Sequence, residues 1–479
     1  MIINKFSKFF TVTVLALGVT SMLGCDDETP SGGNTMGLGA NWTSFGGGAD
    51  NTRHAKDGMI DSGNVNDLRI KFDITTGGSA SNPVVEDGVI YWTDYNGRVH
   101  ASREDGTEIW STRLPIEITA SVGLDANSVY VGDSTAVLHS LNKRTGRVNW
   151  STELDDHDHA YIWGSPAVVD GIVVIGVGGD GTRSAGDALP WSKIRGMRGS
   201  VQGVDAATGK VLWRWSPNDA NGRSYADGNA VWSSCAIDYE LGVCYIGTGN
   251  AWQSPPSPYT DALIALEVHS GVVKWAKSYT PDDVWKGGDC TFCEKDSDVG
   301  ASPILYEIRG RPVVGVGDKA GNFTVHDRVT GQIVWQRKNI RDPTVLGGFI
   351  SSAAYADGKI FVAGNNLIFS SNLYALDANT GRTLWEADNG STFTVGAPAV
   401  SGDVVFSGDA NGLVKAYDVD NGRTLWTSQL PEGRGSDYTI SGGMLIVGNG
   451  FHFFDSEAPL GADKRFPVRG GLRAYALPR

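Results

Sequence analysis

Residues 375–385 read ALDANTGRTLW, and residues 204–213 read VDAATGKVLW. Each stretch is an apolar strand followed by an Asp, a short turn that contains a Gly, and a Trp four residues after that Gly. The same spacing recurs in seven pairs along the chain, which are Gly106–Trp110, Gly146–Trp150, Gly209–Trp213, Gly271–Trp275, Gly331–Trp335, Gly381–Trp385 and Gly422–Trp426. Seven copies in one phase indicate a repeat protein in which each copy is one structural unit.

Each repeat has room for about four strands, which is one blade of a β-propeller. Apolar runs such as residues 88–92 and 358–362 are bounded by Asn, Asp and Gly, as is typical of strands joined by hairpins. A four-stranded sheet with two apolar faces is not stable alone, but sheets stacked in a ring bury both faces. The recurrent Trp is large enough to fill the gap between neighbouring sheets. We therefore expect an all-β fold without amphipathic helices.

The two ends of the chain supply an eighth blade. Residues 471–477 form a further strand that lacks its Trp partner, and residues 68–72 resemble the missing outer strand. If these strands pair, the ring closes without a free edge. The sequence thus predicts an eight-bladed β-propeller that is closed by its N- and C-terminal strands.

The first residues resemble an export signal. A positively charged start precedes a short apolar run that ends in MLGC at residues 22–25, which resembles a bacterial lipobox. We expect a lipoprotein signal peptide over 1–24, a lipid anchor on Cys25, a flexible tether over 25–40 and one propeller over 41–479. The alternative is a simple secretory signal in which Cys25 is incidental.

The predicted location is the cell envelope. Asp26 follows the anchor Cys and resembles an inner-membrane retention signal, so we expect a lipoprotein that faces the periplasm from the inner membrane. The net charge of −14 and the isoelectric point near 5.0 argue against nucleic acid as a partner, because phosphates demand basic surfaces.

Four further cysteines remain in a compartment where disulfides persist. Cys235 and Cys244 flank a plausible turn and could face each other across a hairpin. Cys290 and Cys293 form a Cys-x-x-Cys, for which a local disulfide is expected. No second pair stands at zinc spacing, and no His follows Cys293 as covalent c-type haem attachment requires.

The longest gaps between repeats follow Trp150, Trp213 and Trp275. The extra residues must form loops, and these loops belong to consecutive blades and therefore lie together. They contain Trp191, Trp252, Trp285 and both Cys of the Cys-x-x-Cys. Because loops on a rigid scaffold commonly carry function, we expect the site at the mouth of the central channel, under these loops.

Several stretches resemble a known enzyme family. Residues 231–234 (VWSS), 247–250 (GTGN) and 261–266 (DALIAL) resemble the core of alcohol dehydrogenases that use pyrroloquinoline quinone (PQQ). The polyvinyl-alcohol dehydrogenase branch is the most similar, on the stretches 155–157 (DDH), 198–201 (RGSV), 283–285 (DVW) with Cys290, and 298–303 (DVGASP). The resemblance covers roughly residues 40–479, without the cytochrome part of that branch.

The resemblance implies roles for four residues. Trp232 would be the flat floor under the quinone, or else another inter-blade Trp. Lys319 would contact the quinone oxygens and stabilise the reduced cofactor, or else be a solvated hairpin Lys. Asn250 matches a calcium-binding Asn, or is a turn residue. Arg198 would flank the site, or pair with a structural carboxylate.

Two positions depart from the family. A calcium-binding Glu should stand just before Arg198, where this chain reads Lys193-Ile194-Arg195, which counts against calcium. The family's base Asp should directly follow Trp285, where this chain has Lys286. A Lys serves as a base only if its pKa is strongly lowered, so Asp283 and Asp298 are the alternative candidates.

From these features we expect one of two functions. The first is a PQQ-dependent dehydrogenase that oxidises a small-molecule or polymeric alcohol and passes electrons to an external acceptor such as a cytochrome. The second is a non-catalytic scaffold or binding lipoprotein of the cell envelope, similar to the outer-membrane assembly scaffold. The run at residues 155–159 (DDHDH) is either a solvated acidic loop or a metal cluster.

Overall fold

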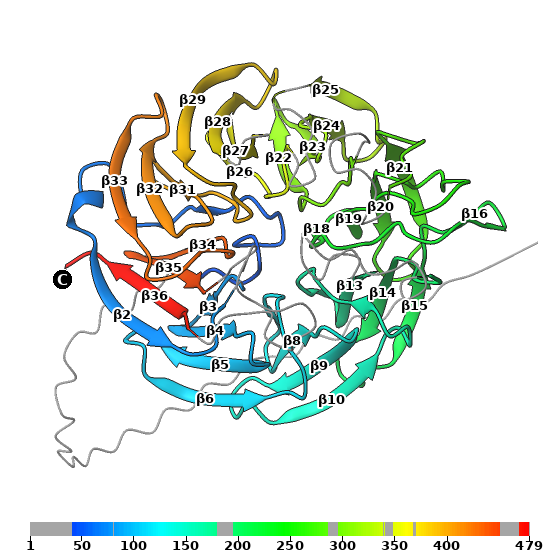
Figure 1. Ribbon diagram of the computed structural model, residues 1–479, viewed down its shortest axis with the longest axis horizontal. Coiled ribbons are helices and arrows are strands. Elements are labelled where there is room, and N and C mark those ends of the chain that lie inside the picture. The colour runs from blue at the N-terminus through cyan, green and yellow to red at the C-terminus, as the bar shows by residue number, and fades with distance from the viewer. Residues whose placement is uncertain are drawn as a thin grey trace, which may run out of the picture. The chain divides into compact units, whose positions relative to one another are not determined.

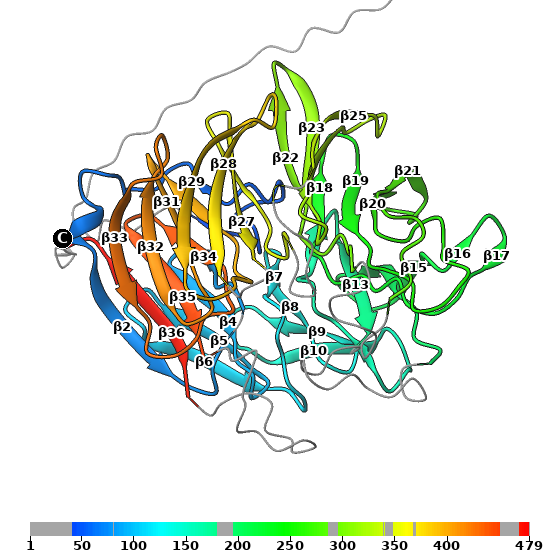
Figure 2. The ribbon, with the colours of Figure 1, turned by 45° about the horizontal axis from the view of Figure 1, so that its top comes forward.

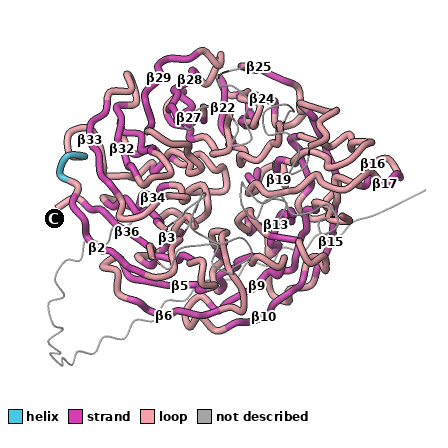
Figure 3. Tube along the Cα trace, viewed as in Figure 1, coloured by secondary structure: helices cyan, strands magenta, loops and turns pink. Residues whose placement is uncertain are grey.

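A computed structural model describes residues 41–478, apart from residue 80 and residues 180–194, 286–295, 339, 341–347, 367–369 and 451–468. Several sequence predictions lie outside the described residues: the signal peptide and tether, Cys25, Lys193, Lys286, Trp191 and the Cys290–Cys293 pair. Within the described part, no helix is long and apolar enough to cross a membrane. The described elements are strands and one short 3-10 helix, η1 (Val65–Asp67) (Figure 3).

The strands form eight antiparallel sheets that follow one another around a ring (Figure 1). The sheets are called blades 1 to 8 in chain order. Blade 1 is β3 (Val84–Glu86), β4 (Val89–Thr93), β5 (Arg98–Arg103) and β6 (Glu108–Arg113); blade 2 is β7 (Gly123–Leu124), β8 (Ser128–Gly132), β9 (Val137–Asn142) and β10 (Val148–Glu153). Blade 3 is β11 (Ala160–Tyr161), β12 (Ala167–Val169), β13 (Ile172–Gly179), β14 (Ser200–Asp205) and β15 (Val211–Trp215); blade 4 is β18 (Ala236–Asp238), β19 (Val243–Gly247), β20 (Ala262–Glu267) and β21 (Val273–Ser278).

The other half of the ring repeats this pattern. Blade 5 is β22 (Ile304–Ile308), β23 (Arg311–Gly317), β24 (Phe323–Asp327) and β25 (Ile333–Arg337); blade 6 is β26 (Ala354–Ala356), β27 (Lys359–Asn365), β28 (Ser371–Asp377) and β29 (Thr383–Gly390). Blade 7 is β30 (Ala399–Ser401), β31 (Val404–Gly408), β32 (Leu413–Asp418) and β33 (Thr424–Gln429), with β1 (His54–Ala55) added in parallel to β30. A hairpin of β16 (Asp219–Ala220) and β17 (Arg223–Ser224) projects from the rim (Figure 1, Figure 2).

Blade 8 joins the two ends of the chain. Strands β34 (Tyr438–Ser441), β35 (Met444–Asn449) and β36 (Gly471–Ala476) come from the C-terminal part, and β2 (Arg69–Thr75) pairs antiparallel with β36 from the N-terminal part. The predicted eight-bladed propeller with terminal closure is therefore confirmed. The expected Cys235–Cys244 disulfide is also present, and it joins the residue before β18 to β19 of blade 4.

The repeated Trp joins each blade to the next. The ring of Trp110 packs on Gly146 of the following repeat, where a Cβ atom would lie 2.5 Å from it, and its indole N–H donates to the Lys143 carbonyl at 3.0 Å. The same pair of contacts recurs for Trp150, Trp213, Trp275, Trp335 and Trp385. At the split blade, Phe72 of β2 takes the place of the Trp and packs on Gly106. The predicted inter-blade role of the repeated Trp is confirmed for these contacts.

A second ring of contacts runs around the inner strands. The backbone N–H of Ser165 donates to the Ser234 hydroxyl at 2.8 Å, and the N–H of Ser234 donates to the Ser302 hydroxyl at 2.8 Å. Equivalent bonds connect further blades. The N–H groups of Asn82, Ser121 and Ser302 donate to the hydroxyls of Ser121, Ser165 and Ser352, and those of Ala397 and Asp437 donate to Oδ1 of Asp437 and of Asn82. We call this set the hydroxyl ring. It places one equivalent residue per blade at a common level of the channel.

The N-terminal segment, residues 42–55, lies against the inner strands in the centre of the ring (Figure 1). It exchanges backbone hydrogen bonds with five blades, through the pairs Trp42–Val85, Ala49–Ile237, Asp50–Leu305, Thr52–Tyr355 and Arg53–Val400. Arg53 is fully buried, and its guanidinium pairs with Asp437 at 3.1 Å. This segment therefore ties the blades together from inside the ring.

Candidate functional site

The site begins at Trp232, which stands two residues before Ser234 of the hydroxyl ring. Its indole packs against Gly300 of blade 5, because a Cβ atom on Gly300 would lie 1.8 Å from indole carbons. The side chain of Trp232 is half-buried, and its indole N–H donates to no other described residue. Trp232 thus differs from the inter-blade Trp residues, whose N–H groups are satisfied.

Lys319 lies in the turn between β23 and β24 and reaches towards Trp232. Its Nζ atom is 5.4 Å from the centre of the Trp232 ring. It donates to Asp296 at 3.0 and 3.1 Å and to Oδ2 of Asp298 at 2.8 Å. The side chain is 13% exposed. Lys319 is therefore the centre of a buried ion-pair cluster, and the solvated hairpin alternative does not describe it.

The cluster shifts the ionisation of its members. Burial raises the pKa of Asp296 to about 7, although the Lys319 charge acts to lower it. Burial alone would lower the pKa of Lys319, but the charges of Asp296 and Asp298 raise it above its usual value. Lys319 is consequently a permanent cation, and Asp296 can exchange a proton near neutral pH.

Asn250 connects blade 4 to this cluster. Its backbone N–H donates to Oδ1 of Asp298 at 2.7 Å, so both oxygens of Asp298 are engaged. Its side-chain amide donates to the carbonyl of Ala251 at 2.9 Å and to that of Trp285. Asn250 is 6% exposed. The buried amide therefore holds the loop of Trp285 against the loop that follows β19.

Two further carboxylates lie behind the cluster. Asp283 accepts the Ser297 N–H at 2.9 Å, and burial raises its pKa. Asp261 is completely buried, and no donor among the described residues serves either of its oxygens. Burial, followed by the charges of Asp298 and Asp283, raises the pKa of Asp261 well above its usual value. Burial and the neighbouring negative charges thus favour the protonated form of Asp261, which lies within hydrogen-bond reach of Asp283.

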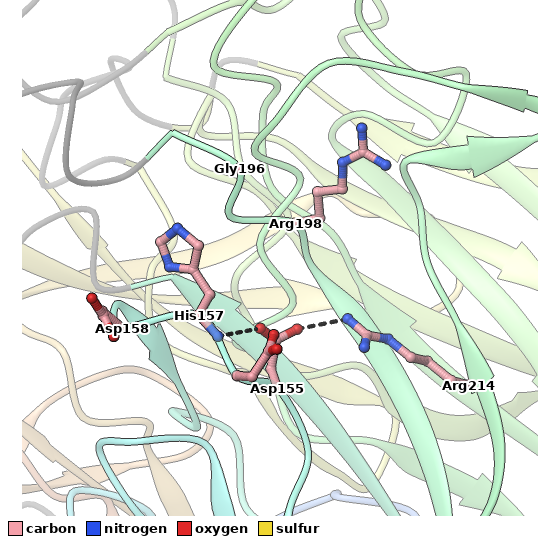
Figure 4. Close-up of a pocket in the computed structure, with 7 residues that line it drawn as sticks. Asp155, His157, Asp158, Gly196, Arg198 and Arg214 are labelled. Carbon is pink, nitrogen blue, oxygen red and sulfur yellow. Dashed lines mark hydrogen bonds and ion pairs between the residues drawn. The ribbon is translucent and has the colours of Figure 1, made fainter.

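Arg198 lies apart from the Lys319 cluster. Its guanidinium donates to the Ser224 hydroxyl at 2.8 Å and lies 3.7 Å from Asp219 and from Asp227. It lines a cleft of about 470 Å³ together with Asp155, Asp156, His157, Asp158, Gly196 and Arg214. Figure 4 shows Arg214 extended towards Asp155, whereas Arg198 points away from it. Pairing with carboxylates is the alternative that the geometry of Arg198 favours.

The acidic run at residues 155–159 belongs to this cleft. Asp155 accepts the His157 N–H at 3.0 Å and pairs with Arg214 at 2.6 Å (Figure 4). Asp156 and Asp158 are exposed. Across the described residues, no group of three His, Cys, Asp or Glu side chains is placed to hold a metal ion. Within the run, Asp155 is thus held by an ion pair, whereas Asp156 and Asp158 face solvent.

The structure brings together five of the residues that the sequence singled out, namely Trp232, Asn250, Asp283, Asp298 and Lys319. It adds two that the sequence reading missed, Asp296 and Asp261. A signal for Asp296 was present, because Asp296-Ser297-Asp298 places two carboxylates on one side of an extended chain. Asp261 follows a turn, and nothing in the sequence marks its complete burial.

Two family models and several characterised proteins are similar to this chain. The family described as glucose/ethanol/alcohol dehydrogenase, beta-propeller domain, matches residues 140–347, and that of the outer membrane protein assembly factor BamB matches residues 319–462. A polyvinylalcohol dehydrogenase of Sphingopyxis sp. (strain 113P3) is 24% identical over 92% of this chain and 77% of its own length. The quinohemoprotein alcohol dehydrogenase ADH IIB of Pseudomonas putida is 25% identical over 83% of this chain and 71% of its own.

Solved structures share the fold. The quinohemoprotein alcohol dehydrogenase ADHIIG of Pseudomonas putida HK5 superposes with a TM-score of 0.75 at 22% identity, over 91% of this chain and 80% of that one. This likeness shows a common fold.

Proposed function

The chain belongs to the PQQ β-propeller family, and from this premise we propose that it is a quinoprotein dehydrogenase that oxidises an alcohol. The observation that carries the proposal is the juxtaposition of Trp232 with the Lys319 cluster. A half-exposed indole with a buried cation at its side suits a flat, anionic aromatic ring.

The described residues fit PQQ better than they fit calcium. Trp232 offers an aromatic surface whose position is set by its contact with Gly300, and Lys319 offers a permanent positive charge. For calcium, Asn250 and Asp298 are the candidate oxygen donors, but both oxygens of Asp298 already accept hydrogen bonds, one of them from the Lys319 cation. The proposed reaction therefore involves no metal ion.

The chemistry divides between cofactor and protein. PQQ, when bound, supplies the acceptor for the hydride of the alcohol. Asp296 takes the proton of the substrate hydroxyl, because a carboxylate with a pKa of about 7 is half-ionised at neutral pH. Lys319 holds Asp296 and Asp298 in place and keeps a positive charge beside the Trp232 ring. Trp232 orients the flat ring in this arrangement.

We also propose a substrate, an electron acceptor and a location for the enzyme. The substrate is a small-molecule or polymeric alcohol, and the relatives named for polyvinyl alcohol support a polymer. Electrons pass to an external acceptor such as a cytochrome, since the sequence holds no Cys-x-x-Cys-His motif. A lipid on Cys25 would hold the protein at the inner membrane, where it faces the periplasm.

A non-catalytic scaffold is the second candidate, and the match of residues 319–462 to the BamB family favours it. The deciding experiment adds PQQ and calcium to the purified chain, then follows absorbance and dye-linked oxidation of polyvinyl alcohol and short alcohols. Uptake of PQQ and turnover that Asp296→Asn abolishes support the dehydrogenase. No uptake at high micromolar PQQ, with or without calcium, supports the scaffold.

A further inference from the structure

Trp163 and Trp232 stand at equivalent positions in neighbouring blades. Trp163 precedes Ser165 by two residues, Trp232 precedes Ser234 by two residues, and the Ser165 N–H donates to the Ser234 hydroxyl at 2.8 Å. Between them, Gly164 approaches the Ser233 carbonyl so closely that a Cβ atom would lie 2.5 Å from its oxygen. The two indoles therefore start from adjacent points on the same rim of the channel.

Trp163 shares the properties that separate Trp232 from the inter-blade Trp residues. Its side chain is half-buried, and its indole N–H donates to no other described residue. The inter-blade residues, in contrast, donate their indole N–H groups to a carbonyl of the next blade, as Trp150 does to Ala206 at 3.1 Å. An indole N–H that has no partner among the described residues, on a half-buried ring, can donate to a ligand.

The position of Trp163 is fixed by Tyr161. The two rings are stacked with centres 4.2 Å apart and planes 20° apart. Tyr161 is 2% exposed, and its hydroxyl accepts a hydrogen bond from Thr119 at 3.3 Å and donates to Glu117 at 3.4 Å. A ring that is held in this way loses little conformational freedom when a ligand binds.

The order of the blades indicates which end of a bound cofactor would lie next to Trp163. Lys319 belongs to blade 5, Trp232 precedes blade 4 and Trp163 lies in blade 3. A three-ring ligand with its quinone end at Lys319 and its middle on Trp232 has its other end at blade 3. In PQQ that far end carries carboxylates, which accept hydrogen bonds from N–H donors.

We propose that Trp163, backed by Tyr161, is a further cofactor-binding residue and that its indole N–H donates to the carboxylate-bearing end of PQQ. This inference rests on the proposed function. Trp232 and Trp163 then divide the recognition of one ligand, since the first supports the flat ring and the second fixes its far end. Rotation of the ligand in the plane of Trp232 is thereby prevented.

The test is calorimetric titration of the full chain with PQQ in excess calcium, for the parent and the variants Trp163→Ala, Trp163→Phe and Trp232→Ala. Trp163→Phe keeps a ring on Tyr161 but loses the N–H, so affinity should fall about tenfold, the loss of one hydrogen bond to a charged group. Trp163→Ala should lose more. Trp426→Phe is the matched control, since Trp426 lies on the outer strand of blade 7, and it should bind as the parent does.

The outcomes separate this inference from the proposed function. Parent affinity in either Trp163 variant, together with weakened binding in Trp232→Ala, overturns the role of Trp163 and leaves the dehydrogenase proposal standing. No binding by the parent overturns both. Thermal melting of each variant without PQQ shows whether it is folded, and Trp163→Phe, which retains the stacked ring, keeps the test valid if Trp163→Ala does not fold.

Discussion

The indole of Trp232 occupies the space that a side chain on Gly300 would fill. A Cβ atom at Gly300 would lie 1.8 Å from Cζ2 and from Cη2 of Trp232, which is far inside the contact distance of two carbon atoms. The two residues stand at equivalent positions in neighbouring blades, because Ser234 and Ser302 follow them by two residues and are joined by a hydrogen bond. Because it has no side chain, Gly300 of the next blade leaves the space that the Trp232 indole occupies at the floor of the site.

Gly300→Ala should displace Trp232 and weaken PQQ binding by about tenfold or more, because a shifted indole no longer matches the Lys319 position. Gly443→Ala is the control, since its Cβ would make only ordinary contacts, the nearest at 3.5 Å. Calorimetry with PQQ compares the two. Equal affinity of Gly300→Ala and the parent would show that Trp232 does not support the cofactor.

Trp213→Ala should lower the free energy of unfolding by about 3–5 kcal/mol, as expected for a buried aromatic ring. Trp213 is 9% exposed, packs on Gly271 and donates its indole N–H to the Val268 carbonyl at 2.8 Å. Its neighbour Leu212 is 46% exposed, so Leu212→Ala should change stability by less than about 0.5 kcal/mol. Urea unfolding measures both, and similar effects would contradict the inter-blade role.

The propeller was predictable because its determinants are local. Each Gly–Trp phrase carries its own strand, turn and docking ring, and the unpaired strand at 471–477 pointed to the partner that residues 69–75 provide. Contacts within one repeat and between adjacent repeats suffice for this conclusion. Trp232, in contrast, was singled out by the resemblance of residues 231–234 to alcohol dehydrogenases that use PQQ.

The acid cluster was not predictable in the same way. Asp261, Asp296 and Lys319 come from different turns of two blades, and only the ring brings them together. The sequence analysis named Asp283, Asp298 and Lys286 as candidate bases, and it did not single out Asp296, which is placed in the cluster by its contact with Lys319, more than twenty residues further along. The orientation of the Arg198 side chain depends on its contacts with Ser224 and Asp227, and no sequence spacing predicts these contacts.

Cys25→Ser should release the protein from membranes into the soluble fraction, because the expected lipid attaches to this Cys. Asp26→Ser is the matched control, since it changes the neighbouring residue and leaves the acylated Cys in place. It should stay membrane-bound and, if Asp26 is the retention signal, move to the outer membrane. Fractionation and palmitate labelling check both, and an unlabelled parent with unchanged retention would exclude the lipid anchor.

The rate of alcohol oxidation should rise as the pH increases through about 7, since Asp296 accepts a proton only when ionised and burial raises its pKa to about 7. Asp296→Asn should remove this dependence and lower kcat/KM by about 10²–10⁴-fold, the usual contribution of a general base. PQQ affinity is measured in parallel to separate binding from turnover. If Asp283→Asn removes the dependence and Asp296→Asn does not, Asp283 is the base.

The change that Asp261→Asn makes in the free energy of unfolding should be more stabilising at pH 8 than at pH 4. The folded pKa of Asp261 is raised above its ordinary value of 3.8, first by burial and then by Asp298 and Asp283. In that case the folded protein keeps a proton that the unfolded chain releases above pH about 4. The free energy of unfolding therefore falls as the pH rises from that value towards the folded pKa.

An Asn at position 261 has the same shape and no charge at any pH, and its amide can donate to Asp283 as the neutral acid does, so this fall should disappear from the pH profile. Asp403→Asn is a control of opposite sign, because hydrogen bonds from Ser62 lower the pKa of Asp403 and contribute stability that is present above pH about 4 and lost in acid. Its cost should therefore stay nearly constant between pH 8 and pH 4 and should fall only as the pH drops below about 4. Urea unfolding of both variants at the two pH values measures the difference, and an Asp261→Asn protein that loses more stability at pH 8 than at pH 4 would mean that Asp261 is ionised in the fold.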